Sequence, residues 1–109
     1  METKRSIDDY KRAGAWMRLL KAVTSKTHIE CSKVLYARDT DKFYAISNRA
    51  ELLCAKAEDN MFMDYPKLGH EYCDIFFGSP DAESRNDVDQ EQIDLMIELV
   101  KELFKDNWK

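Results

Sequence analysis

The chain has 109 residues, of which 44% are hydrophobic and 11% aromatic, and its net charge is −4. This composition excludes a disordered chain, because so much apolar side chain can offset the entropy lost when the backbone is ordered. Every window of 18 residues carries several charges, so we expect no membrane span. The size predicts a single domain over residues 1–109, and three glycines and two prolines predict few, long elements.

The cysteine content predicts a reducing compartment. Cys31, Cys54 and Cys73 are odd in number and widely spaced, which argues against a disulfide framework. The N-terminal residues lead into Asp8 and Asp9 instead of an apolar run, so we expect no secretory signal. The predicted location is the cytoplasm.

Charge is distributed unevenly along the chain. Residues 1–49 carry eleven basic and six acidic side chains, or +5, whereas residues 50–109 carry six and fifteen, or −9. One interpretation is that basic and acidic helices pack side by side; the other is a basic surface for nucleic acid or an acidic surface for a basic partner. We favour the first interpretation, because the two halves nearly cancel.

The first predicted helix covers residues 6–36. Ser6 is a candidate N-cap, and Asp8 and Asp9 stand in the first turn, where the helix dipole favours negative charge. Side chains at helical spacing form one face: Ile7, Tyr10, Gly14, Met17, Thr24, His28, Cys31 and Leu35. Basic side chains occupy roughly the opposite face: Lys4, Arg5, Lys11, Arg12, Arg18, Lys26 and Lys33. The helix could bend near Thr24–Thr27, where a second capping box begins.

A second helix is predicted to begin at Asp39 or Thr40. Apolar residues continue at helical spacing until Pro66, and the residue before a proline avoids helical angles, so this helix should end before Tyr65.

The last third of the chain is predicted to hold a short helix, a loop and a long helix. The apolar segment Leu68–Phe77 is expected to be the short helix, since a lone strand would have no partner. Residues 79–88 are polar and predict a surface loop. Asp87, with Gln90 three residues later, is expected to cap a final helix that extends towards Trp108.

These elements predict an all-α fold, a helical bundle of about four helices, three long and one short. The first helix also places Trp16, Val23 and Val34 away from its main apolar face. Such a wide apolar arc is typical of a central helix or of a helix that contacts a second copy of the protein.

Two histidine–cysteine pairs form a candidate metal site. His28-x-x-Cys31 and His70-x-x-Cys73 each place two ligands on one face of a helix, and together they would make a Cys2His2 site suited to zinc. The alternative is that His28 and Cys31 are core residues, since both lie on the apolar face. The sequence leaves open whether the two pairs meet in space.

The segment Glu71-x-x-Asp74, followed by three apolar residues, resembles part of the carboxylate signature of all-helical nucleotide pyrophosphohydrolases of the MazG and dimeric dUTPase type. In that family an ExxE pair on one helix and an ExxD pair on a later helix hold Mg²⁺ against a triphosphate. The resemblance implies a Mg²⁺ site at Glu71 and Asp74. The earlier ExxE is absent, because Glu51 and Glu58 are seven residues apart. The alternative is two exposed acids on a helix surface.

Two further surfaces are candidates for binding. Lys11, Arg12 and Arg18 could contact a phosphate backbone, but no recognition helix accompanies them, so we expect these side chains to be solvated and do not expect nucleic-acid binding. The end of the second predicted helix is rich in methionine and aromatic residues, which are favoured at protein interfaces. Its candidate partner-binding residues are Met61, Phe62, Met63 and Tyr65. The alternative is that they anchor the helix end in the core.

The sequence contains no catalytic arrangement and no glycine-rich phosphate loop, and we predict neither a cofactor nor an enzyme. The leading functional prediction is a small cytosolic interaction or regulatory protein that acts through helix-face contacts with a partner or a second copy. The alternatives are a metal-binding protein and a nucleic-acid-binding protein. The metal-binding protein would be either a zinc protein at the two histidine–cysteine pairs or, as the resemblance implies, a Mg²⁺-dependent nucleotide pyrophosphohydrolase that uses Glu71 and Asp74.

Overall fold

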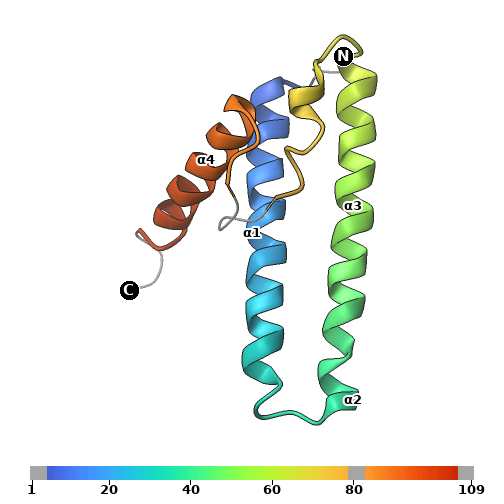
Figure 1. Ribbon diagram of the computed structural model, residues 1–109, viewed down its shortest axis with the longest axis vertical. Coiled ribbons are helices and arrows are strands. Elements are labelled where there is room, and N and C mark those ends of the chain that lie inside the picture. The colour runs from blue at the N-terminus through green and yellow to red at the C-terminus, as the bar shows by residue number, and fades with distance from the viewer. Residues whose placement is uncertain (1–4, 79–82, 106–109) are drawn as a thin grey trace.

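The computed structural model describes residues 5–78 and 83–105, and it confirms the predicted all-α fold. Three long helices are α1 (Ile7–Cys31), α3 (Lys42–Asp64) and α4 (Asp87–Leu103). Two short elements are the helix α2 (Ala37–Thr40) and the single 3-10 turn η1 (His70–Tyr72). Helices α1 and α3 form a long antiparallel pair, and α4 crosses the side of α1 (Figure 1).

Within the described ranges, none of the helices is both long and apolar enough to cross a membrane.

The start of α1 is fixed by a capping box. The backbone N–H of Asp9 donates to the Ser6 hydroxyl at 3.0 Å, and the Ser6 N–H donates to the Asp9 carboxylate at 3.1 Å. The helix is continuous through Thr24–Thr27 and ends at Cys31, five residues before the predicted end. The prediction was too long because residues 32–36 turn the chain back towards α3, and the Leu35 N–H closes the helix end on the Cys31 carbonyl at 2.9 Å.

The second predicted helix is divided near its start. Helix α2 begins at Ala37, and Asp41 separates it from α3, which ends at Asp64 as Pro66 predicted. The N–H of Tyr65 donates to the Met61 carbonyl at 2.9 Å and closes the last turn.

The predicted short helix Leu68–Phe77 is mostly wrong, since only the turn η1 is helical there. Carbonyls near the end of this segment accept hydrogen bonds from side chains of other helices. Lys21 donates to the Phe76 carbonyl at 2.9 Å, and Gln92 donates to the Ile75 carbonyl at 3.1 Å. Residues 73–78 therefore form a strap across one side of the α1–α3 pair, held by the helices that it crosses.

The N-cap of helix α4 lies one residue before the predicted cap. The Asn86 side chain, and not Asp87, accepts from the Asp89 N–H at 2.8 Å. The helix ends at Leu103, and the predicted extension to Trp108 lies outside the described residues. Residues 83–86 confirm the predicted non-helical loop as far as the structure describes it.

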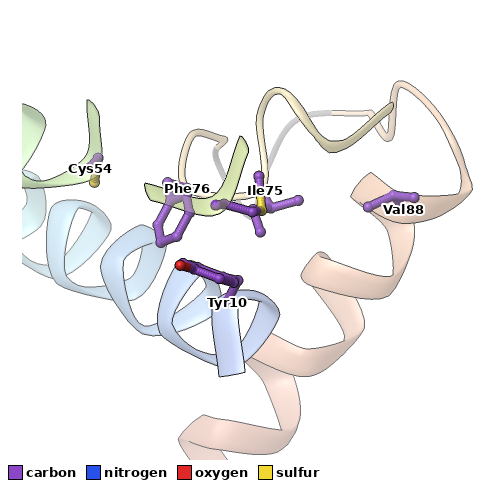
Figure 2. Close-up of a cluster of buried hydrophobic side chains, with 6 residues drawn as sticks. Tyr10, Cys54, Ile75, Phe76 and Val88 are labelled. Carbon is purple, nitrogen blue, oxygen red and sulfur yellow. The ribbon is translucent and has the colours of Figure 1, made fainter. Parts of the chain in front are cut away.

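The main core lies where the strap covers α1 and α3. Ile75 and Phe76 of the strap pack with Tyr10 of α1, Cys54 of α3 and Val88 of α4 (Figure 2). The buried Met61 of α3 completes this cluster. A second, smaller cluster joins α1 to α4, and its members are Ala15, Met96 and Leu99, with Leu19 and Leu95 packed against them.

The prediction that Arg18 belongs to a solvated basic face of the first helix is wrong, because its side chain is only 1% exposed. Its guanidinium donates to the Ile75 carbonyl at 3.1 Å, to the Asp74 carbonyl at 2.6 Å and to the Asp89 carboxylate at 2.6 Å. Arg85 also donates to the Asp89 carboxylate, at 3.0 Å. Burial disfavours the charged form of Asp89, but the hydrogen bonds from Arg85 and Arg18 outweigh it and hold its pKa well below the ordinary value.

The basic and acidic parts of the chain form ion pairs with each other within the fold. Lys11 of α1 pairs with Glu91 of α4 at 2.7 Å, and Arg12 pairs with Glu102 at 3.1 Å. Together with the buried pair of Arg18 and Asp89, these contacts place basic residues of α1 against the acidic helix α4, as the first interpretation of the charge distribution predicted.

The first prediction concerns the buried ion pair. Replacing Asp89→Asn should lower the free energy of unfolding by about 3 kcal/mol, because Arg18 stays charged and buried without its counter-ion. Urea unfolding measures the loss. The control is Glu102→Gln, which removes the exposed partner of Arg12 and should cost less than about 1 kcal/mol. Equal losses in the two variants would contradict the prediction.

The second prediction concerns Gly14, which faces the strap. A Cβ on Gly14 would clash with the backbone oxygen of Ile75 and lie 3.0 Å from the Gln92 side-chain nitrogen. Gly14→Ala should therefore destabilise the protein by about 1–3 kcal/mol, although alanine favours helix. The neighbouring exposed site gives the control: Ala13→Gly should cost about 1 kcal/mol through helix propensity alone. Thermal unfolding compares the variants, and a stabilised Gly14→Ala protein would refute the close contact.

Candidate functional site

The first histidine–cysteine pair lies at the distal end of α1, far from the strap. The His28 ring stacks on Phe43 with centroids 5.3 Å apart and meets Tyr44 edge-on at 4.8 Å. Cys31 is the last residue of α1 and is partly buried. The aromatic neighbours of His28 fit the alternative interpretation of this pair as part of the packing between α1 and α3.

The second pair lies beside the opposite end of α1. His70 is the first residue of η1, and Cys73 is the residue directly after η1. The neighbouring Tyr72 ring is 5.7 Å from the Lys11 ammonium, which places η1 next to the second turn of α1. From Lys11 to Cys31 the helix rises by roughly 30 Å. The structure therefore does not bring the two pairs together within one chain.

Across residues 5–78 and 83–105, no three histidine, cysteine or acidic side chains are grouped so that they could hold a metal ion.

The acidic residues on which the resemblance to pyrophosphohydrolases rests do not form one cluster, and two of them pair with basic residues. Asp74 accepts from the Arg85 guanidinium at 2.7 Å, whereas Glu71 is exposed. Glu51 pairs with Lys21 at 3.4 Å. Burial, and then the negative charge of Asp74, raises the pKa of Glu58, so α3 does bring one carboxylate towards the strap. The two carboxylates are those of Glu58 and Asp74, and Arg85 is bound to Asp74. The resemblance implies a site of four carboxylates.

The basic residues proposed for a phosphate backbone are occupied by contacts within the chain. Arg18 is buried, and Lys11 and Arg12 pair with acidic residues of α4. The hydrogen bond that Lys11 donates to the Glu91 carboxylate raises the pKa of Lys11, as expected for a lysine with a stable anionic partner. Helix α4 thus lies over the surface that a nucleic acid would need.

The four candidate partner-binding residues at the end of α3 have different environments. Met61 is fully buried in the core and Phe62 and Tyr65 are partly buried, whereas Met63 is exposed. The prediction that Met61 binds a partner is therefore wrong, because a side chain inside the core cannot contact a partner. This helix end is tied to the start of α1, since the Tyr10 hydroxyl donates to Asp64 and the Tyr65 hydroxyl donates to the Arg5 carbonyl at 2.5 Å.

A different surface has the properties of a binding site, and it lies on the side of the α1–α3 pair that faces away from the strap. On α1 the strap contacts Arg18, and Leu20 lies about 200° around the helix from it. On α3 the buried Cys54 faces α1, Glu58 lies on its strap side, and Leu53 lies on the other side.

We call this surface the outer face and define it by five large apolar side chains that are 38–62% exposed. They are Trp16, Leu20 and Val23 of α1, and Ile46 and Leu53 of α3. The contacts of His28 with Tyr44 and of Lys21 with Glu51 set the register of the antiparallel pair. In that register Leu20 and Leu53 stand at the same level, so the two helices contribute to one continuous apolar surface.

Sequence analysis identified only part of the outer face. It singled out Trp16, Val23 and Val34, but Val34 lies in the turn after α1. Leu20 was missed, although Trp16, Leu20 and Val23 recur at intervals of four and three, the signal of a second helical stripe. Ile46 and Leu53 are seven residues apart and carry the same signal in α3.

Searches with the sequence and the structure found no matching family model, no matching curated protein and no matching solved structure.

The third prediction concerns Tyr10 at the junction of α1 and α3. Burial and the hydrogen bond to Asp64 raise the pKa of Tyr10 from 10.0 to about 12. The folded protein thus keeps this proton more tightly than the unfolded chain, so the contribution to stability is complete below pH 10 and is lost as pH rises towards 12.

In Tyr10→Phe this part of the pH dependence should vanish, and at neutral pH the variant should lose about 1 kcal/mol with its hydrogen bond. Urea midpoints measured between pH 8 and 12 for the two proteins provide the test. Parallel curves for wild type and variant would show that Tyr10 does not titrate as described.

Proposed function

We propose that this protein is a non-enzymatic helical interaction module that binds a protein surface through its outer face. The observation that supports this function is the continuous apolar surface formed by five exposed side chains on α1 and α3. Single exposed apolar residues are normal on protein surfaces, whereas a contiguous apolar patch is typical of an interaction site.

The magnitude of the hydrophobic effect supports the proposal. Complete burial of a valine, leucine or isoleucine side chain contributes about 1.5–3 kcal/mol, so covering five half-exposed side chains contributes roughly 5 kcal/mol from this surface alone. A partner with a similar apolar face would about double the gain. Association costs about 4–15 kcal/mol in lost freedom, so binding requires a partner that covers the whole outer face.

The shape of the surface supports a helical partner. Two antiparallel helices present parallel ridges of side chains, and helices of a partner can pack their own ridges into the grooves between them. The binding mode is therefore helix-face packing, in which specificity comes from the spacing of Leu20 and Leu53 and from the charges that border them.

We propose the cytoplasm as the compartment. The three cysteines Cys31, Cys54 and Cys73 are all unpaired, and free thiols persist in reducing compartments. Burial raises the pKa of Cys54, which keeps this thiol protonated and unreactive.

The fourth prediction tests the outer face with neighbouring positions that provide a matched pair. Leu53 belongs to the outer face, whereas Leu52 is equally large and also exposed but lies about 100° around α3. A photo-crosslinking amino acid at position 53 should give at least about tenfold more covalent adduct in source cells than the same amino acid at position 52.

Mass spectrometry of the adduct identifies the bound protein, whether another protein or a second copy. Equal labelling from positions 52 and 53, or no adduct from position 53, would exclude the outer face as the binding surface.

A further inference from the structure

We infer that the occupant of the outer face is a second copy of this chain, so that α1 and α3 of two chains form a four-helix core. This inference rests on the proposed function and names its partner. It is carried by the arrangement of apolar and charged residues across the two helices, which is complementary to itself.

Each helix of the pair carries a second stripe beside the one that joins α1 to α3. On α1 the second stripe follows a strict alternation of four and three residues, and its members are Asp9, Ala13, Trp16, Leu20, Val23, Thr27 and Glu30. On α3 the same alternation gives Lys42, Ile46, Arg49, Leu53, Lys56 and Asn60. A helix with two adjacent stripes is typical of a four-helix bundle, where every helix packs against two neighbours.

The charges in these two stripes have opposite signs. Acidic residues stand at both ends of the α1 stripe, Asp9 and Glu30, whereas the α3 stripe carries Lys42, Arg49 and Lys56 at intervals of seven. A second copy related by a twofold axis parallel to the helices would place α1 of one chain across from α3 of the other. In the register of the pair, Glu30 of one chain then faces Lys42 of the other, and the symmetry makes this contact twice.

The register within one chain allows this pairing. Because His28 lies against Tyr44 and Lys21 against Glu51, Glu30 and Lys42 stand at the same level along the pair. Both side chains have local partners: Glu30 pairs with Lys33 at 3.1 Å and Lys42 with Asp39 at 3.7 Å, each across one turn. Exposed pairs of this kind contribute little, so they leave the two residues available to a second copy.

The other elements leave the outer face accessible. The strap covers the opposite side of the α1–α3 pair, and α4 packs on α1 at Ala15 and Leu19. Among residues 5–78 and 83–105, the outer face therefore remains uncovered along the middle of both helices, where Leu20 and Leu53 would meet their counterparts at the centre of the four-helix core.

The fifth prediction is tested by sedimentation velocity over a concentration series from about 1 to 100 µM, the range in which an interface of this size should associate. Wild type should sediment with twice the mass of the chain. Leu53→Glu should sediment as a monomer, because it places a charge at the centre of the interface, while the control Leu52→Glu should remain dimeric. Circular dichroism verifies that both variants are helical.

A charge exchange keeps the inference testable if Leu53→Glu fails to fold. Lys42→Glu alone should raise the dissociation constant about fivefold, and the double variant Glu30→Lys with Lys42→Glu should restore it, because the opposite charges face each other again across the dimer. Both residues are exposed, so neither change disturbs the core.

Wild type that stays monomeric at the highest concentration would overturn the inference, and so would equal dissociation constants for Leu52→Glu and Leu53→Glu. The crosslinking experiment separates this failure from that of the proposed function. A monomeric protein whose position 53 is crosslinked to a different protein retains the function but not the second copy. A monomer without any adduct at position 53 loses both.

Discussion

The rest of the structure depends on the buried guanidinium of Arg18. At this side chain α1, the strap and α4 all meet, because its donors reach two strap carbonyls and the carboxylate of Asp89. A buried charge is costly unless it is paired and hydrogen-bonded, so this site tolerates little displacement of any of the three elements. Arg18 therefore fixes the positions of these elements together with the apolar contacts of Ile75 and Phe76.

The same contacts explain why the helices were predictable and the strap was not. The capping residue Ser6, the spacing of apolar residues and Pro66 are local signals, and they predicted the start of α1 and the end of α3 correctly. The structure of Leu68–Phe77 depends on side chains 50 or more residues away, Arg18 and Lys21, which donate to the carbonyls of Ile75 and Phe76. Periodicity in a short apolar segment cannot reveal such partners, and it indicated a helix instead.

The environments of the predicted site residues depend on long-range packing in the same way. Arg18 was predicted to belong to a solvated basic face. The helical periodicity of α1 alone cannot show that α4 and the strap cover the Arg18 side chain. His28 was correctly placed on the inner side of α1, but its distance to His70 and Cys73 depends on where the chain turns. The outer face was predictable in principle from the second stripe of α1, and it was recognised only in part because Leu20 was assigned to neither face.

The strap also has consequences for the order in which the molecule assembles. Residues 73–78 form one backbone hydrogen bond among themselves, from the Phe77 N–H to the Asp74 carbonyl at 2.9 Å, so they gain little from ordering before α1 and α4 offer donors. The α1–α3 hairpin relies on contacts between neighbouring helices and can form first. We therefore expect a hairpin-like intermediate on the folding route, with the docking of strap and α4 as one concerted late step. In that intermediate both sides of the hairpin would be bare, and early pairing of hairpins through the wrong side is the misassembly that this architecture must avoid.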